Sequence, residues 1–120
     1  MSKRIALIHA TPVAMQPVSD AFQQGWPEAE TINLLDDALS RDLARIGTLD
    51  ETMMRRIAAL ADYAVSTGID GILYTCSAFG EAIAAVQRRA MFPVLKPNEA
   101  MFEQALQGGG RVGLLATFEP

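Results

Sequence analysis

The fold is decided by the stretch Ile72-Leu73-Tyr74-Thr75-Cys76-Ser77-Ala78-Phe79-Gly80. It completes an apolar run that begins at Ile69, and such a run is typical of a buried strand. Small polar residues end the run, and apolar residues at helical spacing follow directly after it. The only cysteine of the chain, Cys76, is therefore predicted at a turn from a strand into a helix.

The rest of the chain repeats this alternation of strand and helix. Strands are predicted over residues 4–9, 31–35, 69–74 and 93–96, and helices over residues 14–25, 79–89 and 99–107, with one more helix between the second and third strands. A capping-box pattern, Thr48-Leu49-Asp50-Glu51, opens the helix that Gly68 ends, and residues 36–47 indicate a short helix or a lid. Strict alternation predicts an α/β fold, a parallel four-stranded sheet with helices on both faces.

A fifth strand is predicted over residues 111–117, after a run of three glycines. Its first residues, Arg111-Val112-Gly113-Leu114-Leu115, repeat the pattern of Arg4-Ile5-Ala6-Leu7-Ile8. The alternative explanation of this repeat is that two buried parallel strands resemble each other by chance over five residues. We nevertheless expect residues 1–110 to form a first lobe, and residues 111–120 to be the first strand of a truncated second lobe.

Composition limits the classes of function. The 120 residues are half hydrophobic and one-fifth charged, which indicates one globular domain. A net charge of −4 argues against a nucleic-acid surface, and no apolar run is long enough to span a membrane. A single cysteine excludes an internal disulfide and fits a reducing cytoplasm, so we expect a cytoplasmic protein.

The position of Cys76 suggests chemistry. Ligands of open α/β sheets bind at the carboxyl ends of the strands, where a thiol faces the amino end of the following helix. Unpaired N–H groups and the helix dipole favour a thiolate there. The same N–H groups, with the hydroxyls of Thr75 and Ser77, are suited to hold a substrate carboxylate. The competing interpretation is that Cys76 is a small core residue without a chemical role.

Several motifs are absent. The turn after the first strand, His9-Ala10-Thr11-Pro12-Val13, has no glycine and is not a dinucleotide fingerprint, and the glycine run precedes a strand and is no P-loop. With one histidine and one cysteine, a zinc site is not indicated. A dyad of His9 with Cys76 remains open. The polar residues predicted at the carboxyl edge are His9, Thr11, Asp36, Cys76, Ser77, Lys96 and Asn98.

The sequence resembles the Asp/Glu/hydantoin racemase superfamily, which includes maleate isomerases and arylmalonate decarboxylases. The resemblance is carried by the first strand with Thr11-Pro12, the turn Tyr74-Thr75-Cys76-Ser77, Pro93-Val94 with Asn98-Glu99-Ala100, and the stretch Arg111-Val112-Gly113-Leu114-Leu115-Ala116-Thr117-Phe118. It runs through essentially the whole chain. Its specific part is the Thr-Cys-Ser turn together with the Gly-Leu-Leu-Ala-Thr-Phe strand.

This resemblance implies two similar lobes with an active site between them, no cofactor, and a pair of cysteines that move an α-proton. Cys76 matches the first-lobe cysteine, and Thr75 and Ser77 match neighbours that bind the substrate carboxylate. His9 and Thr11 occupy the loop that assists this cysteine, although a histidine departs from the acidic or serine residues usual there. Asn98 is a further expected substrate-binding residue.

We therefore expect a cofactor-independent racemase or isomerase of amino acids or related carboxylic acids. The 120 residues alone are expected to be inactive, because half of the cleft is missing, and to self-associate or form a homodimer. An arylmalonate-type decarboxylase, a maleate-isomerase-like enzyme and a non-enzymatic flavodoxin-like binding module are the alternatives.

Overall fold

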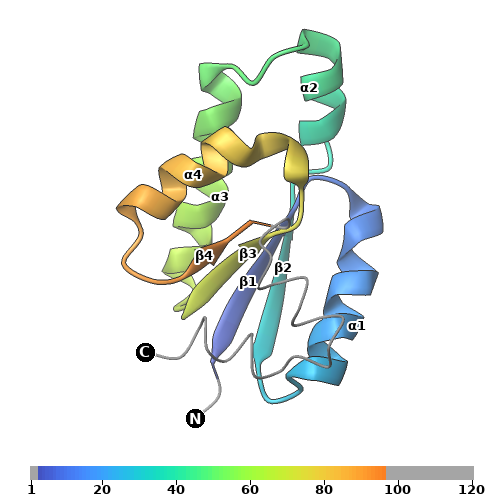
Figure 1. Ribbon diagram of the computed structural model, residues 1–120, viewed down its shortest axis with the longest axis vertical. Helices are drawn as coiled ribbons and strands as arrows, with labels where there is room; N and C mark the ends of the chain where they lie inside the picture. Colours follow the sequence, from blue (N-terminus) through green and yellow to red (C-terminus); the bar gives the residue numbers. More distant parts are fainter. Residues whose placement is uncertain (1–2, 97–120) are drawn as a thin grey trace.

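Strands and helices alternate along the computed structural model, which describes residues 3–96 (Figure 1). The elements in chain order are β1 (Arg4–His9), the 3-10 turn η1 (Pro12–Ala14), α1 (Met15–Gly25), β2 (Glu30–Leu35), α2 (Leu39–Ile46), α3 (Glu51–Ser66), β3 (Gly71–Tyr74), the 3-10 turn η2 (Ser77–Phe79), α4 (Gly80–Arg89) and β4 (Val94–Leu95). The predicted helix over residues 99–107, the fifth strand and the boundary at residue 110 lie outside the described residues.

The sheet confirms the predicted fold class. Its four strands follow the order β2-β1-β3-β4, and every neighbouring pair is parallel. Leu7 of β1 lies opposite Asn33 of β2 on one side and Leu73 of β3 on the other. β1 is therefore a central strand, which explains why Ile5 to Ile8 are all buried.

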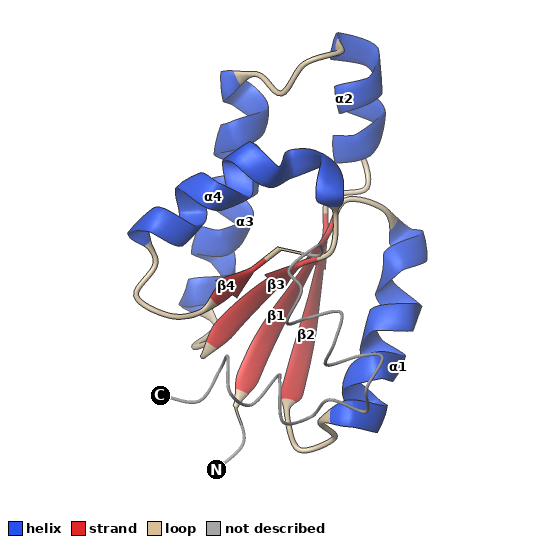
Figure 2. Ribbon diagram, in the orientation of Figure 1, coloured by secondary structure: helices blue, strands red, loops and turns tan. Residues whose placement is uncertain are grey.

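Helices cover both faces of the sheet, as Figure 2 shows. Successive side chains of a strand point to opposite faces, so each strand contributes to two cores. Ile5, Leu7 and Leu73 pack with Phe22 and Trp26 at α1. Alternate strand residues pack with the second layer, formed by α2, α3 and α4, and this larger core contains Ala6, Ile8, Ile72, Tyr74, Leu39, Met53, Ile57, Ile83 and Val86.

The chain turns to opposite faces after β1 and β3. The segment after β1 leads into α1 on one face, whereas the segment after β3 leads into α4 on the other. Such a reversal between neighbouring strands is a topological switch point, and ligands of open α/β sheets bind at the strand carboxyl ends beside it. We call the end of β1 at His9, the end of β3 at Tyr74 and the segments that follow them the switch-point edge.

The residues between β2 and α3 differ in part from the prediction. Residues 39–46 form the helix α2, one of the two forms predicted for this stretch, and α2 lies beyond the carboxyl ends of the strands (Figure 1). The capping box was wrong in its first residue, because the N-cap of α3 is Asp50 rather than Thr48. Its Oδ1 accepts a hydrogen bond from the backbone N–H of Met53 at 2.9 Å. At the other end of α3, Gly68 has φ +80, as its predicted place just after the helix requires.

This cap gives a direct test of the α3 boundary. Asp50→Ala removes the acceptor for the Met53 N–H and is expected to lower the free energy of unfolding by about 1 kcal/mol. Thr48→Ala, the matched control, is expected to change it by only a few tenths of a kcal/mol, roughly the size of an ordinary surface substitution. Urea titration followed by circular dichroism measures both. A larger loss for Thr48→Ala would contradict the observed boundary.

Candidate functional site

His9 is the polar centre of the switch-point edge. It is the last residue of β1 and only 1% exposed, the one polar residue among the fully buried ones in the part of the chain that the structure describes. Its Nδ1 lies 2.8 Å from Oγ1 of Thr75, and its Nε2 lies 2.7 Å from Oδ1 of Asn33. Both ring nitrogens are therefore hydrogen-bonded, as a buried imidazole requires.

The hydrogen bonds of His9 connect the ends of β1 and β3 with β2, and a further contact reaches α1. Thr75 follows β3, His9 ends β1, and Asn33 lies on β2. The side-chain amide Nδ2 of Asn33 donates a hydrogen bond to Oγ of Ser19 on α1, at 3.5 Å. We call the series Thr75, His9, Asn33 and Ser19 the polar chain. It runs across the carboxyl half of the sheet on the face that α1 covers.

Burial lowers the pKa of His9 below its ordinary value of 6.5, and the hydrogen bond with Asn33 offsets part of that effect. The imidazole is consequently neutral near pH 7, with one nitrogen that donates and one that accepts. His9 is held by Thr75 and Asn33, and no hydrogen bond joins it to Cys76 among the described contacts. The His9–Cys76 dyad that the sequence left open is therefore absent from this arrangement.

Thr75 is joined to β1 twice. Its backbone N–H donates to the Ile8 carbonyl at 3.0 Å, which extends the parallel ladder by one residue beyond β3. Its Oγ1 lies 3.4 Å from the same carbonyl, considerably farther than from His9 Nδ1. The side chain is partly buried, so Thr75 is a fixed and accessible polar group at the switch-point edge.

Cys76 follows Thr75 and has extended backbone angles, with φ −108 and ψ 121. The free thiol side chain is partly exposed and packs against the core between the sheet and α2, α3 and α4. With Leu39, Phe79 and Ile83 it lines a small cavity that has room for about one water molecule. The 3-10 turn η2 lies between Cys76 and α4, so the thiol precedes the first turn of α4 by one short helical turn.

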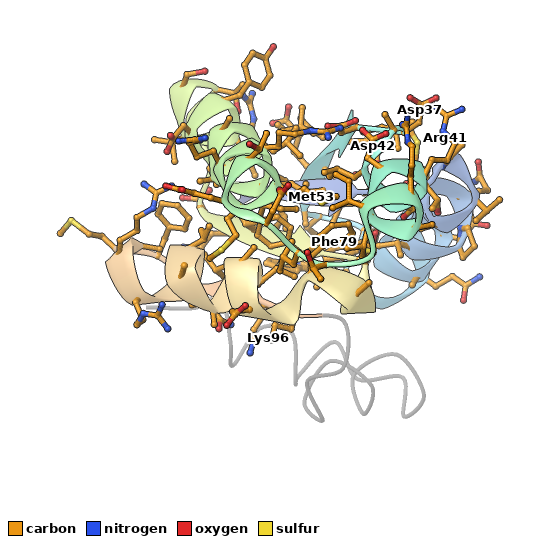
Figure 3. The ribbon with its side chains drawn as sticks, turned by 90° about the horizontal axis from the view of Figure 1, so that it is seen from above. Asp37, Arg41, Asp42, Met53, Phe79 and Lys96 are labelled. Atoms are coloured by element: carbon orange, nitrogen blue, oxygen red, sulfur yellow. The ribbon has the colours of Figure 1, made fainter. Side chains whose placement is uncertain are left out.

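The remaining predicted site residues are placed as follows. Thr11 comes two residues after β1, is partly exposed, and precedes η1. The backbone of Ser77 opens η2, while the side chain of Ser77 and the whole of Asn98 lie outside the described part of the structure. Lys96 follows β4 and lies apart from α2 in Figure 3. The structure thus brings His9 and Thr75 into contact and places Thr11 and Cys76 on the segments that follow β1 and β3.

Asp36, also predicted at the carboxyl edge, belongs to a cluster of charges centred on Arg56. The guanidinium of Arg56 donates to Asp36 Oδ2 at 2.9 Å and to Asp42 Oδ2 at 2.8 Å, and Asp42 also pairs with Arg45. The hydrogen bond from Arg56 lowers the pKa of Asp42, and the two carboxylates raise the pKa of Arg56. Figure 3 shows Asp42 on α2 and Met53 between α2 and α3. Arg56 therefore fastens α2 to α3 and is already paired with two carboxylates.

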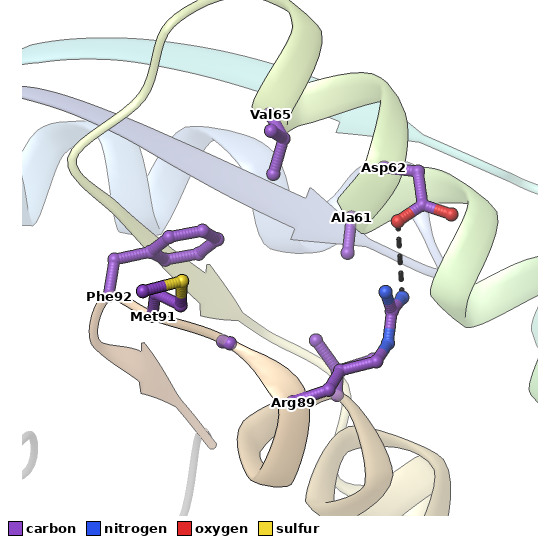
Figure 4. A pocket seen from close by; sticks show the side chains of 8 residues that line it. Ala61, Asp62, Val65, Arg89, Met91 and Phe92 are labelled. Atoms are coloured by element: carbon purple, nitrogen blue, oxygen red, sulfur yellow. Dashed lines mark hydrogen bonds and ion pairs between the residues drawn. The ribbon is translucent and has the colours of Figure 1, made fainter.

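A groove elsewhere on the molecule has no part in this arrangement. About 300 Å³ in volume, it lies between the last turns of α3 and α4 and is lined by Ala61, Asp62, Val65, Val86, Arg89, Ala90, Met91 and Phe92 (Figure 4). Asp62 and Arg89 pair at 3.2 Å, and the other lining residues are apolar. Because these helix ends lie toward the amino ends of the strands, the groove is remote from Cys76.

Residues 3–96 contain neither a cluster of metal ligands nor a helix that could span a membrane. No three His, Cys, Asp or Glu side chains in that range lie close enough together to bind a metal ion. None of the helices described there combines the length and the apolar character that crossing a membrane demands.

Sequence reasoning missed Asn33, Ser19 and Arg56. Asn33 interrupts the apolar run Ile32 to Leu35 of an edge strand, and its parallel register with Leu7 puts its side chain on the α1 face. A polar residue in such a run was the available signal. Its partner was not readable, because the contact with His9 depends on the strand register.

The buried neutral His9 predicts a pH dependence of stability. Its folded pKa lies below 6.5, so the unfolded state takes up a proton first as the pH falls. The stability that neutral His9 contributes is fully present well above pH 6.5 and is lost as the pH falls below 6.5 through the folded pKa. His9→Gln is expected to flatten this slope in urea titrations. His9 is the only histidine, so equal slopes in both proteins would contradict its burial in the neutral form.

Arg56 acts as a clamp that holds α2 against α3 through Asp36 and Asp42, and substitutions at two neighbouring arginines of α3 test this role. Arg56→Gln leaves Asp36 and Asp42 without their shared cation and is expected to lower the urea midpoint and speed amide exchange in α2. Arg55→Gln is the matched control, because Arg55 is exposed and, among the residues that the structure describes, pairs only with Glu51 at 3.8 Å. Equal effects of the two substitutions would contradict the assignment of Arg56 as the clamp.

Comparison with known proteins identifies the family. The family model of the Asp/Glu/hydantoin racemases matches residues 8–119, which include the end of β1 at His9, the whole of β3 and Cys76. No curated protein sequence matches the chain. The match covers nearly all of the 120 residues, and the parallel α/β fold agrees with it. The chain therefore belongs to the Asp/Glu/hydantoin racemase family.

Proposed function

We propose that this chain is a lobe of a cofactor-independent racemase that acts on amino acids or related carboxylic acids, with Cys76 as the residue that moves the α-proton. The observation that carries the proposal is the position of Cys76. It directly follows Thr75 at a topological switch point and remains partly exposed there. The racemase family of the chain supplies the class of reaction.

Removal of an α-proton requires a base and preorganised hydrogen-bond donors. A thiolate of Cys76 takes the proton from the α-carbon, and the electron pair of the broken C–H bond moves onto the carboxylate as an enediolate. Donors that point at this developing charge stabilise it, and we assign that role to Ser77, Asn98, Thr11 and backbone N–H groups near η2. Return of the proton from the thiol regenerates the acid and the thiolate.

Inversion needs an acid or base on each face of the α-carbon, and the sequence contains one cysteine. Cys76 accounts for one face. We propose that the group on the other face belongs to a second lobe, or to a partner chain in a homo-oligomer. On this account the inactivity expected of the 120 residues alone is confined to net racemisation. They exchange the α-proton on one face but do not accumulate the opposite enantiomer.

Exchange in D₂O tests the proposal. L-Aspartate, L-glutamate and a 5-substituted hydantoin are incubated with the protein, and deuterium at the α-carbon is followed by mass spectrometry and chiral chromatography. We expect deuterium in at least one substrate with retained configuration, and a loss of about 10²-fold or more in Cys76→Ser, the usual range for a lost general acid or base.

Ser66→Ala is the control, because Ser66 lies at the last turn of α3 and its hydroxyl donates to the Tyr63 carbonyl of the same helix. It is expected to exchange at the wild-type rate. Exchange that survives in Cys76→Ser, or the absence of exchange with every substrate, would overturn the proposed role of Cys76. Full racemisation by the 120 residues alone would overturn the assignment of the second face to another lobe.

A further inference from the structure

The polar chain has a direction, because each hydrogen bond in it needs one donor and one acceptor. Asn33 presents its carbonyl oxygen Oδ1 to His9 Nε2 and its amide Nδ2 to Ser19 Oγ. A carbonyl oxygen only accepts, so Nε2 of His9 carries the proton. The imidazole is neutral, and its Nδ1 is therefore an acceptor.

The only donor that faces Nδ1 in the described structure is the Thr75 hydroxyl, at 2.8 Å. The alternative acceptor for this hydroxyl, the Ile8 carbonyl, is 3.4 Å away and already accepts from the Thr75 backbone N–H. The single hydrogen of the Thr75 hydroxyl is thus directed at His9. The lone pairs of the Thr75 hydroxyl oxygen remain available to accept a hydrogen bond from another group.

We propose that Asn33 is a positioning residue which, through His9, fixes the Thr75 hydroxyl as a hydrogen-bond acceptor at the switch-point edge, where it receives an N–H group of the ligand. This assigns Thr75 a role other than the carboxylate donor that its residue type suggests. It also gives Asn33, which touches no ligand itself, control over which polar group the site accepts.

The consequence is a preference among ligands of the same shape. A carboxylate oxygen placed against Thr75 Oγ1 would meet lone pairs, whereas an ammonium or amide N–H would meet an acceptor. An α-amino acid is therefore favoured over the same diacid without its amino group. The inference about ligands rests on the proposed function, but the direction of the polar chain does not.

Imidazole nitrogen NMR tests the direction first. His9 is the only histidine, so its two nitrogen resonances are unambiguous. Two-dimensional spectra of ¹⁵N-labelled protein near pH 7 are expected to show the proton on Nε2 and a hydrogen-bonded, unprotonated Nδ1. Thr75→Val removes the donor to Nδ1, so the Nδ1 resonance is expected to shift while the proton stays on Nε2. A proton on Nδ1 in the wild-type protein would overturn the proposal.

Asn33 is tested by two substitutions at a solvent-exposed position of the edge strand. Asn33→Asp keeps an acceptor for Nε2–H and is expected to retain the Nε2–H form. Asn33→Leu removes the acceptor and is expected to give a mixture of both neutral forms. An unchanged Nε2–H form in Asn33→Leu would overturn the positioning role. If Asn33→Leu does not fold, Asn33→Asp provides the test, and loss of the Nε2–H form in that variant would overturn the positioning role of Asn33.

Binding of a matched pair tests the ligand. L-Aspartate and succinate differ only in the amino group, and calorimetry is expected to show roughly tenfold tighter binding of aspartate, the size of one charge-assisted hydrogen bond. Thr75→Val is expected to bring the two affinities close together. Equal preference in wild type and Thr75→Val would overturn the acceptor role. Failure of both acids to bind would contradict the proposed function, and the NMR result would still decide the direction of the polar chain.

Discussion

The hydrogen bond between His9 and Thr75 ties together the two strand ends on which the site depends. β1 and β3 are neighbours in the sheet, but the chain leaves them toward opposite faces. Any polar group between them is enclosed and needs a partner, since an unpaired buried donor or acceptor costs about 1–3 kcal/mol. The imidazole fills this position with one bond to each side. The chain segment that carries Cys76 is thereby fixed relative to β1. Arg56 separately holds α2 against α3.

Most of the fold was readable from the sequence. β1 and β3 are short apolar runs bounded by polar residues, and the helices between them show regular apolar spacing, so the alternation alone indicated a parallel sheet. The cap of α3 was misread, because Thr48 and Asp50 are both good capping residues. Only the observed bond from Met53 to Asp50 separates them. Asp50 starts the helix two residues later than the box pattern suggested.

The site was only partly readable. The position of Cys76 after a buried strand follows from local pattern, and so does the presence of His9 at the end of β1. The link of His9 to Asn33 depends on the register between β1 and β2, which no local pattern specifies. The same is true of Arg56, whose two carboxylate partners are 20 and 14 residues away along the chain. Residue types thus indicated where chemistry is possible, and the sheet decided which side chains meet.

We infer that Cys76 is an accessible thiol at a ligand site rather than part of the core against which it packs. Alkylation by iodoacetamide tests this directly, because the protein has one cysteine and one mass shift to follow. We expect the folded protein to be alkylated, and we expect aspartate or a related acid to slow the reaction while an uncharged solute of similar size does not. A thiol that reacts only after unfolding in urea, or at a rate that no carboxylate changes, would contradict it.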